Sequence, residues 1–483
     1  MACPIDNKCS RYSRRPIGIG STRSAALLLL AITVTCATLA GQTLASRPLA
    51  PVYPLKASPN GRYLTDSNGV PFLLMGDSPQ SMIANLTPQL MSLYMANRQI
   101  LGFNSILVDA LCTSYTGGNG NGTSYNGTPP FTSGTDPSNY DLSTPNPAYF
   151  AELDALVHLA ANYNLNVVLD PIETGGWLGT LENNGPAKAY NYGAYLGNRY
   201  RGFANIVWHS GNDFQTWSTS PSDNNLVHQV MLGIASVDPH HLQTIELNYD
   251  FSYSNQDTTL DNVLTMDACY TYFETYDCFV QAYPSTPVIP LFLTEANYEY
   301  ENNTGELPGP TGPYVLREQA YWTLTSGGAG QLYGNHYTWL FPPGWQLFLI
   351  SPGAREIKYI NGLFATLPWQ ELVPDTTHQV VTAGYGTYDG GNANLTTATY
   401  CTTAWIPGSH ALTYCPQSTT LTVDLGVFSG LTRARWYDPS SGVFLRISGS
   451  PFHNTGSQHF TTPGNNQDGN PDWVLDLDPA AAP

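Results

Sequence analysis

The sequence predicts a (β/α)₈ barrel followed by a small antiparallel β-sandwich. Three observations support this fold class. Eight short apolar runs lie between residues 71 and 336, helical segments separate them, and the pattern changes after about residue 367 to short alternating stretches. Eight strands with helical crossovers in about 300 residues match the size of a single (β/α)₈ barrel.

The strand candidates are runs rich in β-branched and other apolar residues. They are 71–77, 103–110, 166–173, 205–208, 241–249, 263–270, 287–295 and 329–336. Between them, 147–163 predicts a helix, because Asn146 is a favoured cap and Pro147 suits a first helical turn. A doubly wound sheet is the alternative, but "GDSPQS" after the first run is not its glycine-rich phosphate turn.

The C-terminal part predicts a separate β-domain. Its strand candidates include "TLTVDLGVF", "LTRARWYDPSSGVF" and "PDWVLDLD", and "YDPSSG" has the Pro and Gly of a turn. We therefore expect a barrel over 46–367 and a β-sandwich over 368–483.

Residues 1–45 predict a secretory signal peptide. Four arginines precede an apolar segment over 25–40, and small residues follow it, with cleavage expected after Ala40 or Ala45. The protein is therefore expected to be secreted or periplasmic. An uncleaved membrane anchor is the alternative, although the apolar segment is short for a bilayer span.

The charge balance excludes polyanionic partners. Cleavage after Ala45 leaves 13 basic and 35 acidic residues, a net charge near −22. Such a surface repels nucleic acid and anionic membranes, so we expect neither as a partner. Composition specifies no oligomeric state.

The cysteines suit an oxidising compartment. Three of the eight lie in the leader, and Cys269 with Cys278 and Cys401 with Cys415 could each close a short disulfide loop. Cys112 is expected to be a buried thiol. Since no CxxC, HxH or similar ligand spacing is present, we expect no metal and no cofactor.

Polar residues follow most of the proposed strands, where a barrel has its active site. Asp213 follows the fourth strand and Glu295 ends the seventh. A barrel radius of roughly 7–8 Å puts these strands ~14 Å apart, and inward side chains reduce the gap to roughly 5–9 Å. This range covers the carboxyl separations of both retaining and inverting glycosidases. Asp213 and Glu295 are thus the predicted catalytic pair, although Asp213 could instead cap the following helix.

Other polar and aromatic residues near the strand ends are candidates for binding a sugar. They are Asp77, Asp109, Glu173, Trp177, Trp208, His209, Asn212, Asn248, Tyr270, Tyr298, Gln331, Tyr333, His336 and Trp339. Asp77 and Asp109 are equally consistent with a structural role. Tyr272 is a further aromatic of this region, and Tyr115, Tyr125 and Phe131 lie in a long loop over 112–147. This loop either covers the mouth or is a disordered surface segment.

Three other glutamates have less specific interpretations. Glu299 and Glu301 are expected to be solvated. Glu246 lies within a strand candidate, as a packing residue or one that supports the site.

Five segments in order resemble the apiosidase-like glycoside hydrolases, glycoside hydrolase family 140 and its relatives. They are "RYLTDSNGVPFLLMGDSPQSMIANLT", "YMANRQILGFNSI", "NRYRGFANIVWHSGND", "LTEANYE" and "GGAGQLYGNHYTW". In addition, "GLTRARWYDPSSGVF" resembles the small C-terminal β-domain that accompanies these barrels and is named for collagen binding.

The resemblance implies a (β/α)₈ barrel with Asp213 and Glu295 as the catalytic pair. In a retaining mechanism Asp213 would be the general acid/base and Glu295 the nucleophile. Asn212 replaces the glycine that is typical beside the aspartate, and Gln331 replaces a common histidine, which bears on the sugar bound.

The predicted function is therefore a glycoside hydrolase acting on plant or microbial cell-wall polysaccharide. One alternative is a non-catalytic glycan- or matrix-binding protein on a barrel scaffold. Another is a metal-dependent hydrolase, which would lose its activity with a chelator.

Overall fold

The computed structural model describes residues 50–249, 251–392 and 394–480. The predicted signal peptide lies outside these residues. The described chain opens with a small antiparallel sheet of β1 (Lys56–Ala57), β2 (Leu64–Thr65) and β3 (Pro71–Phe72). This sheet leads directly into the first strand of the barrel.

Eight parallel strands form the predicted barrel. They are β4 (Leu74–Asp77), β5 (Ser105–Asp109), β6 (Asn166–Asp170), β7 (Ile206–Ser210), β8 (Gln243–Ile245), β10 (Asp267–Tyr270), β11 (Leu291–Glu295) and β12 (Gly330–Tyr333). Seven lie within predicted apolar runs, and the fourth extends two residues beyond the predicted run 205–208. Because β12 pairs in parallel with β4, the last strand returns to the first. The fold class predicted from the sequence is confirmed.

The ring has no strand ladder between β8 and β10, and a short insertion bridges this gap. Strand β9 (Ser252–Tyr253) pairs antiparallel with β10. The Ser254 hydroxyl donates to the Ile245 carbonyl at 2.6 Å and accepts the Ala268 N–H at 2.9 Å. One serine side chain therefore connects the two strands.

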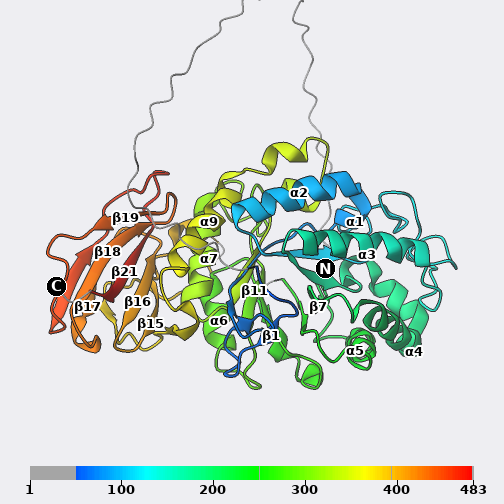
Figure 1. Cartoon of the computed structure of the whole chain (residues 1–483), viewed down its shortest axis with the longest axis horizontal. Coiled ribbons are helices and arrows are strands. Elements are labelled where there is room, and N and C mark those ends of the chain that lie inside the picture. Colours follow the sequence, from blue (N-terminus) through cyan, green and yellow to red (C-terminus); the bar gives the residue numbers. More distant parts are fainter. Residues whose placement is uncertain (1–49, 250, 393, 481–483) are drawn as a thin grey trace, which may run out of the picture. The chain divides into compact units, whose positions relative to one another are not determined.

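Helices lie between most of the barrel strands (Figure 1). They are α1 (Met82–Asn85), α2 (Pro88–Leu101), α3 (Pro147–Asn162), α4 (Thr174–Tyr200), α5 (Pro221–Ala235), α6 (Thr275–Ala282), α7 (Pro313–Thr325), α8 (His336–Trp339) and α9 (Pro352–Phe364). As predicted, the Asn146 side chain caps α3 by accepting the Ala148 N–H. Helix α4 is kinked where Gly185 has a left-handed backbone before Pro186.

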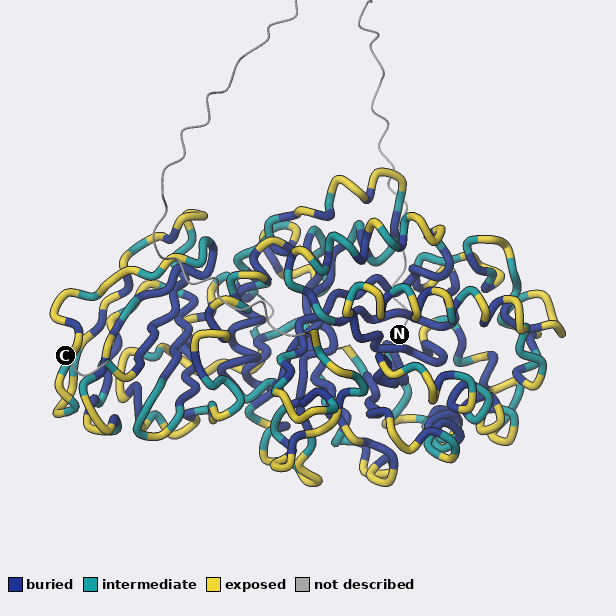
Figure 2. The backbone as a smooth tube through the Cα atoms, viewed as in Figure 1, coloured by how far each residue is buried: buried dark blue, intermediate teal, exposed yellow. Residues whose placement is uncertain are grey.

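The barrel interior has an apolar layer below a polar one. Side chains from seven strands make up the apolar layer: Leu74, Leu107, Val168, Val207, Ala268, Phe292 and Leu332. Two residues further along five of these strands, on the same face by the two-residue period of a strand, lie the polar side chains. They are Asp109, Asp170, His209, Tyr270 and Thr294. All are buried, in line with the dark blue centre of the barrel in Figure 2.

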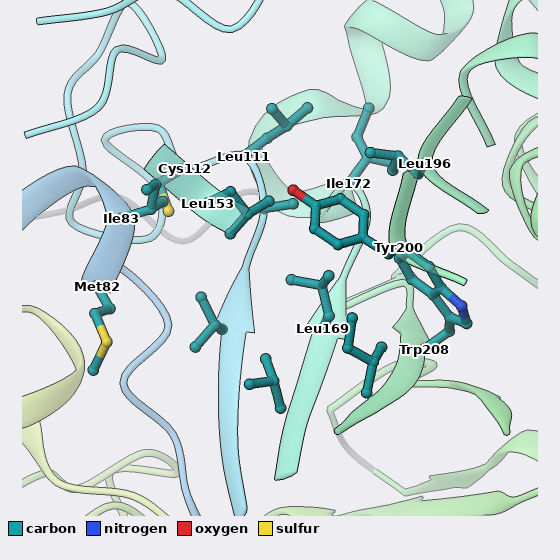
Figure 3. Close-up of a cluster of buried hydrophobic side chains, with 14 of the residues drawn as sticks. Met82, Ile83, Leu111, Cys112, Leu153, Leu169, Ile172, Leu196, Tyr200 and Trp208 are labelled. Carbon is teal, nitrogen blue, oxygen red and sulfur yellow. The ribbon is translucent and has the colours of Figure 1, made fainter. Parts of the chain in front are cut away.

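Alternate residues of the same strands point outward into the core beneath the helices. Leu169 and Trp208 lie in a cluster with Leu153, Leu196 and Tyr200 (Figure 3). The parity of each strand therefore decides which side chains reach the mouth.

The C-terminal part is the predicted antiparallel β-sandwich. One sheet contains β13 (Val373–Pro374), β15 (Thr402–Ile406), β16 (His410–Cys415), β21 (Trp473–Pro479), β18 (Thr432–Asp438) and β19 (Val443–Arg446). The other contains β14 (Val381–Ala383), β17 (Thr420–Asp424) and β20 (Ser457–Thr461). Strands β13, β16 and β20 lie outside the predicted strand segments.

The cysteines follow the sequence prediction in part. Cys269 on β10 and Cys278 on α6 form a disulfide. Cys112 is a buried thiol. Cys401 and Cys415 flank the paired residues Thr402 and Tyr414 of β15 and β16, yet both are free and buried in the structure.

Candidate active site

A cavity of about 140 Å³ lies at the C-terminal ends of the barrel strands. Its lining comes from the segments after six strands: Gln80, Tyr115, Thr116, Asn212, Asp213, Tyr272, Glu295, Tyr298, Glu301, Asn303 and Trp339. Five of these are among the sugar-binding and catalytic candidates from the sequence: Asn212, Asp213, Glu295, Tyr298 and Trp339. The cavity therefore occupies the place where a barrel carries its chemistry.

Asp213 reaches this cavity from the turn after β7. Its Oδ1 accepts the Tyr270 hydroxyl at 2.7 Å, and its Oδ2 accepts the Tyr115 hydroxyl at 2.6 Å. The alternative role as a helix cap does not apply, because Ser220 caps the following helix α5.

Glu295 reaches the cavity through a β-bulge. The register between β10 and β11 shifts so that Tyr270 pairs with Glu295, and such bulges redirect side chains beside active sites. Glu295 Oε1 accepts the Tyr272 hydroxyl at 2.6 Å. Its Oε2 accepts the Tyr298 hydroxyl at 2.7 Å and the Gln80 amide at 3.4 Å.

Tyr270 connects the two carboxyl groups. Its hydroxyl oxygen lies 2.7 Å from Asp213 Oδ1 and 3.0 Å from Glu295 Oε1, so these oxygens are at most about 5.7 Å apart. One hydroxyl has one proton and cannot donate to both. A proton on either Asp213 Oδ1 or Glu295 Oε1 resolves this, because the protonated acid then donates to Tyr270 and Tyr270 donates to the ionised acid.

Burial and the charges of neighbouring acids raise the pKa values of several carboxyl groups here. Burial raises the pKa of Asp213, and burial together with the charge of Asp213 raises the pKa of Glu295. The pKa of Glu295 rises to about 8, yet Glu295 accepts more hydrogen bonds than Asp213, which favours the Glu295 anion. The pair is thus arranged to retain a proton into the neutral range.

Three predicted residues support the cavity from behind. Asp109 Oδ1 accepts the Asn212 amide at 3.2 Å. Glu173 caps α4 by accepting the Gly176 N–H at 2.6 Å. Burial lowers the pKa of His209 to about 3, so its ring is neutral.

Four predicted residues point outward from the barrel, away from the cavity lining. Asp77 accepts from Tyr94 and Arg98 of α2, so it is a buried ion-pair residue. Trp208 donates to Asp238 at 2.9 Å. Gln331 and Tyr333 line a separate small cavity beneath α7 and α9. Each occupies the outward parity of its strand.

Three more candidates belong to the surroundings of the mouth. Trp177 is fully buried and stacks on Tyr140 with ring centroids 6.0 Å apart. Asn248 accepts the Trp217 indole N–H at 2.7 Å. His336 Nδ1 lies 2.9 Å from Glu301 Oε1, so it contacts a residue of the lining.

Two glutamates expected to be solvated differ in exposure, and the Glu301 side chain keeps 19% of its surface exposed. Glu299 is buried and accepts from Tyr333, Asn335 and the Gly353 N–H. Glu301 lines the cavity, and its Oε1 also accepts the Trp339 indole N–H at 2.7 Å. Both glutamates accept hydrogen bonds from the segment after β12, which the sequence does not show to be their neighbour.

The long loop over 112–147 covers part of the mouth. Tyr115 lies in the cavity, Phe131 is buried, and Tyr125 packs against the core from a half-buried position. Of the three aromatic residues of this loop, Tyr115 lines the cavity, and Thr116 of the same loop lines it as well.

The described residues contain no group of three or more His, Cys, Asp or Glu side chains placed to hold a metal ion. Within the same residues, no helix has the length and apolarity needed to cross a bilayer.

Two solved structures resemble the chain along most of its length. A protein described as a glycoside hydrolase has 21% identity and a TM-score of 0.74, covering 89% of this chain and 97% of its own. A glycoside hydrolase family 5 protein from Bacteroides vulgatus ATCC 8482 has 22% identity and a TM-score of 0.73, covering 88% and 93%. No curated protein matches the sequence. The structural likeness supports the barrel fold.

Two family models match the sequence. "Putative collagen-binding domain of a collagenase" matches residues 392–478. "Apiosidase-like, catalytic domain" matches residues 58–371, well over half of the chain and including every residue of the cavity lining. The chain therefore belongs to the apiosidase-like catalytic domain family and is a glycoside hydrolase.

Proposed function

We propose that this enzyme cleaves glycosidic bonds in plant or microbial cell-wall polysaccharide by means of Asp213 and Glu295. The observation that carries the proposal is the single Tyr270 hydroxyl within hydrogen-bond distance of both carboxyl groups. Oxygens no more than about 5.7 Å apart suit the ~5–5.5 Å separation of a retaining pair better than the ~6.5–9.5 Å of an inverting pair.

In this mechanism Asp213 donates its proton to the glycosidic oxygen as the bond to the anomeric carbon breaks. Glu295 attacks that carbon and forms a glycosyl ester. Asp213, now ionised, removes a proton from water, which attacks the same carbon and releases Glu295 as a carboxylate. The starting state of this cycle is a protonated Asp213 and an ionised Glu295, the pattern that the larger number of hydrogen bonds to Glu295 favours.

The test is reducing-sugar release from pectic, hemicellulosic and arabinose-containing polysaccharides. Asp213→Asn and Glu295→Gln should each fold and lose at least about 10³-fold in turnover. Glu318→Gln is the control, since Glu318 is a fully buried carboxyl that lies on α7 outside the cavity lining. NMR of the first product should show the anomeric configuration of the substrate.

Near-wild-type turnover by either variant would refute the assigned pair. Glycan binding without release of sugar, across the whole panel, would instead favour the non-catalytic glycan-binding alternative.

We also propose that the enzyme is exported and that cleavage follows Ala40 or Ala45. The basic, apolar and small-residue order at the N-terminus supports this. N-terminal sequencing of the protein recovered outside the cytoplasm should give a chain starting near residue 41 or 46, and an intact Met1 there would contradict it.

A further inference from the structure

A third carboxyl group, that of Glu246, lies directly behind the pair. Glu246 follows β8 and is fully buried. Its Oε1 accepts the Asp213 peptide N–H at 3.1 Å, and its Oε2 accepts the Thr294 hydroxyl at 2.8 Å. It thus contacts the backbone of one proposed catalytic residue and the immediate neighbour of Glu295.

The backbone that Glu246 contacts has an unfavourable conformation. Gly211, Asn212 and Asp213 have φ angles of 96°, 46° and 62°, a left-handed run in which the last two residues are not glycine. Gly211 is required here, because a Cβ would lie 2.2 Å from the Glu246 carbonyl oxygen. Such conformations persist where surrounding contacts hold them. For Asp213 the acceptor of its N–H is the Glu246 carboxylate.

Thr294 and His209 hold Glu246 in turn. The Thr294 hydroxyl that donates to Glu246 lies 2.7 Å from His209 Nε2. Because burial keeps His209 neutral, a protonated Nε2 can donate to Thr294 and leave the Thr294 proton for Glu246. Both oxygens of Glu246 then accept hydrogen bonds, and these bonds favour its ionised form against the burial and the charges of Glu295 and Asp213, which raise its pKa.

The groups that face Glu246 leave its charge uncompensated. Asp213 comes from the turn after β7 and Glu295 from β11, and the neutral His209 ring lies 3.6 Å from its Oε2. Tyr270 and Tyr298 complete the surroundings as neutral hydroxyls. Among the described residues, no lysine or arginine forms an ion pair with it. Repulsion between Glu246 and the two catalytic carboxyls is mutual, and it raises the pKa of Glu246 as well.

We infer that Glu246 is a positioning residue, which holds the left-handed Asp213 turn through its peptide N–H and keeps a proton on the Asp213 carboxyl by repulsion. This inference rests on the proposed role of Asp213, and its charge component has a readout that needs no substrate.

Two substitutions separate the parts of this role. Glu246→Gln keeps the length and an acceptor oxygen but removes the charge. Glu246→Asp keeps the charge, but its carboxylate is one methylene shorter and withdraws from the Asp213 N–H.

The effect of the Glu246 charge is tested by measuring the melting temperature as a function of pH. Asp213→Asn is made both in the wild-type chain and in Glu246→Gln. A carboxyl whose pKa is raised by folding destabilises the fold as pH rises from its unfolded pKa to its folded pKa. Asparagine does not ionise and so avoids this cost. The gain in stability from Asp213→Asn should therefore grow between the unfolded and the folded pKa of Asp213 and become constant above the folded pKa. In the Glu246→Gln background it should level off about one pH unit lower.

As the control, Asp213→Asn is also made in Glu318→Gln. There the pH above which its stabilisation becomes constant should be the same as in the wild-type chain. If the stabilisation became constant at the same pH in the wild-type chain and in Glu246→Gln, the proposed repulsion between Glu246 and Asp213 would be overturned. This outcome is independent of whether any substrate is found, so it is distinct from failure of the proposed function.

The positioning part is tested by hydrogen exchange of the peptide that contains Asp213. Glu246→Asp should increase exchange of that segment, and unchanged protection would overturn the inference. With a substrate from the panel, Glu246→Asp should lower kcat without moving the alkaline midpoint, whereas Glu246→Gln should lower that midpoint by about one pH unit. A midpoint unchanged in Glu246→Gln would contradict the repulsion.

Discussion

At the scale of single residues, the site depends on tyrosine hydroxyls rather than on cations. Tyr115, Tyr270, Tyr272 and Tyr298 form hydrogen bonds with the carboxyl oxygens of the catalytic pair, and the Tyr270 hydroxyl is shared by both carboxyl groups. A hydroxyl can donate and accept at the same time, which a lysine or arginine cannot do. Tyr270 can therefore accept from a protonated Asp213 while it donates to an ionised Glu295.

Tyr270→Phe tests this arrangement because it removes only the shared hydroxyl. Hydrogen bonds to charged groups contribute about 1.5–3 kcal/mol, so we expect kcat to fall by roughly 10- to 100-fold in a folded protein. Tyr192→Phe is the matched control, since Tyr192 is also fully buried but donates to the Pro171 carbonyl under α4. The measurement is kcat on the substrate from the panel, with melting to check folding. A loss in Tyr270→Phe no larger than that in Tyr192→Phe would contradict the shared-proton arrangement.

At the scale of elements, apolar runs were sufficient to predict all eight barrel strands. Each run is buried on both faces, between the barrel interior and the helices, and this produces the continuous apolar pattern of parallel strands. The short insertion with β9 and Ser254 has no such pattern. The sequence does not predict this insertion, because it joins two strands through the single side chain of Ser254 and needs no apolar pattern.

The same apolar runs hide the parity of each strand. Asp77 and Trp208 were selected as sugar-binding candidates because they end or follow apolar runs, but both point outward. Inward residues lie two positions from a residue of the apolar layer. On β7, Val207 and His209 therefore point into the barrel, whereas Trp208 between them points outward. Counting in steps of two from one residue known to point inward identifies which residues of a strand face the barrel interior.

The remaining cavity residues could not be placed from sequence. Gln80, Thr116, Glu301 and Asn303 lie in loops, where the path of the backbone depends on other loops that are distant in sequence. Glu301, for example, is held by Trp339 from the segment after β12. The position of Glu295 depends on a β-bulge between β10 and β11. The register shift of this bulge is a property of the two paired strands, so the sequence of one strand does not reveal it.

At the scale of the whole molecule, the β-sandwich is bonded to the barrel through buried groups. Arg317 of α7 donates from Nε and Nη2 to both oxygens of Asp472, at 2.9 and 3.0 Å, and from Nη1 to Glu356 of α9 at 2.8 Å. Beside this pair, Tyr321 of α7 stacks on Tyr414 of β16 with ring centroids 5.0 Å apart. Contacts of this kind resemble a shared core and predict that the two domains unfold together.

Arg317→Met tests this coupling. Removing the guanidinium leaves Asp472 and Glu356 as buried acids without their partner, which costs about 3–5 kcal/mol. We expect calorimetry to show a single unfolding transition that moves to markedly lower temperature. Arg433→Met is the matched control: Arg433 pairs with Asp478, but its side chain is 49% exposed, so its loss should cost at most about 1 kcal/mol. A separate low-temperature transition in Arg317→Met, with the main transition unmoved, would mean that the β-sandwich unfolds independently. The barrel would then owe its stability to its own two-layered interior and helices alone.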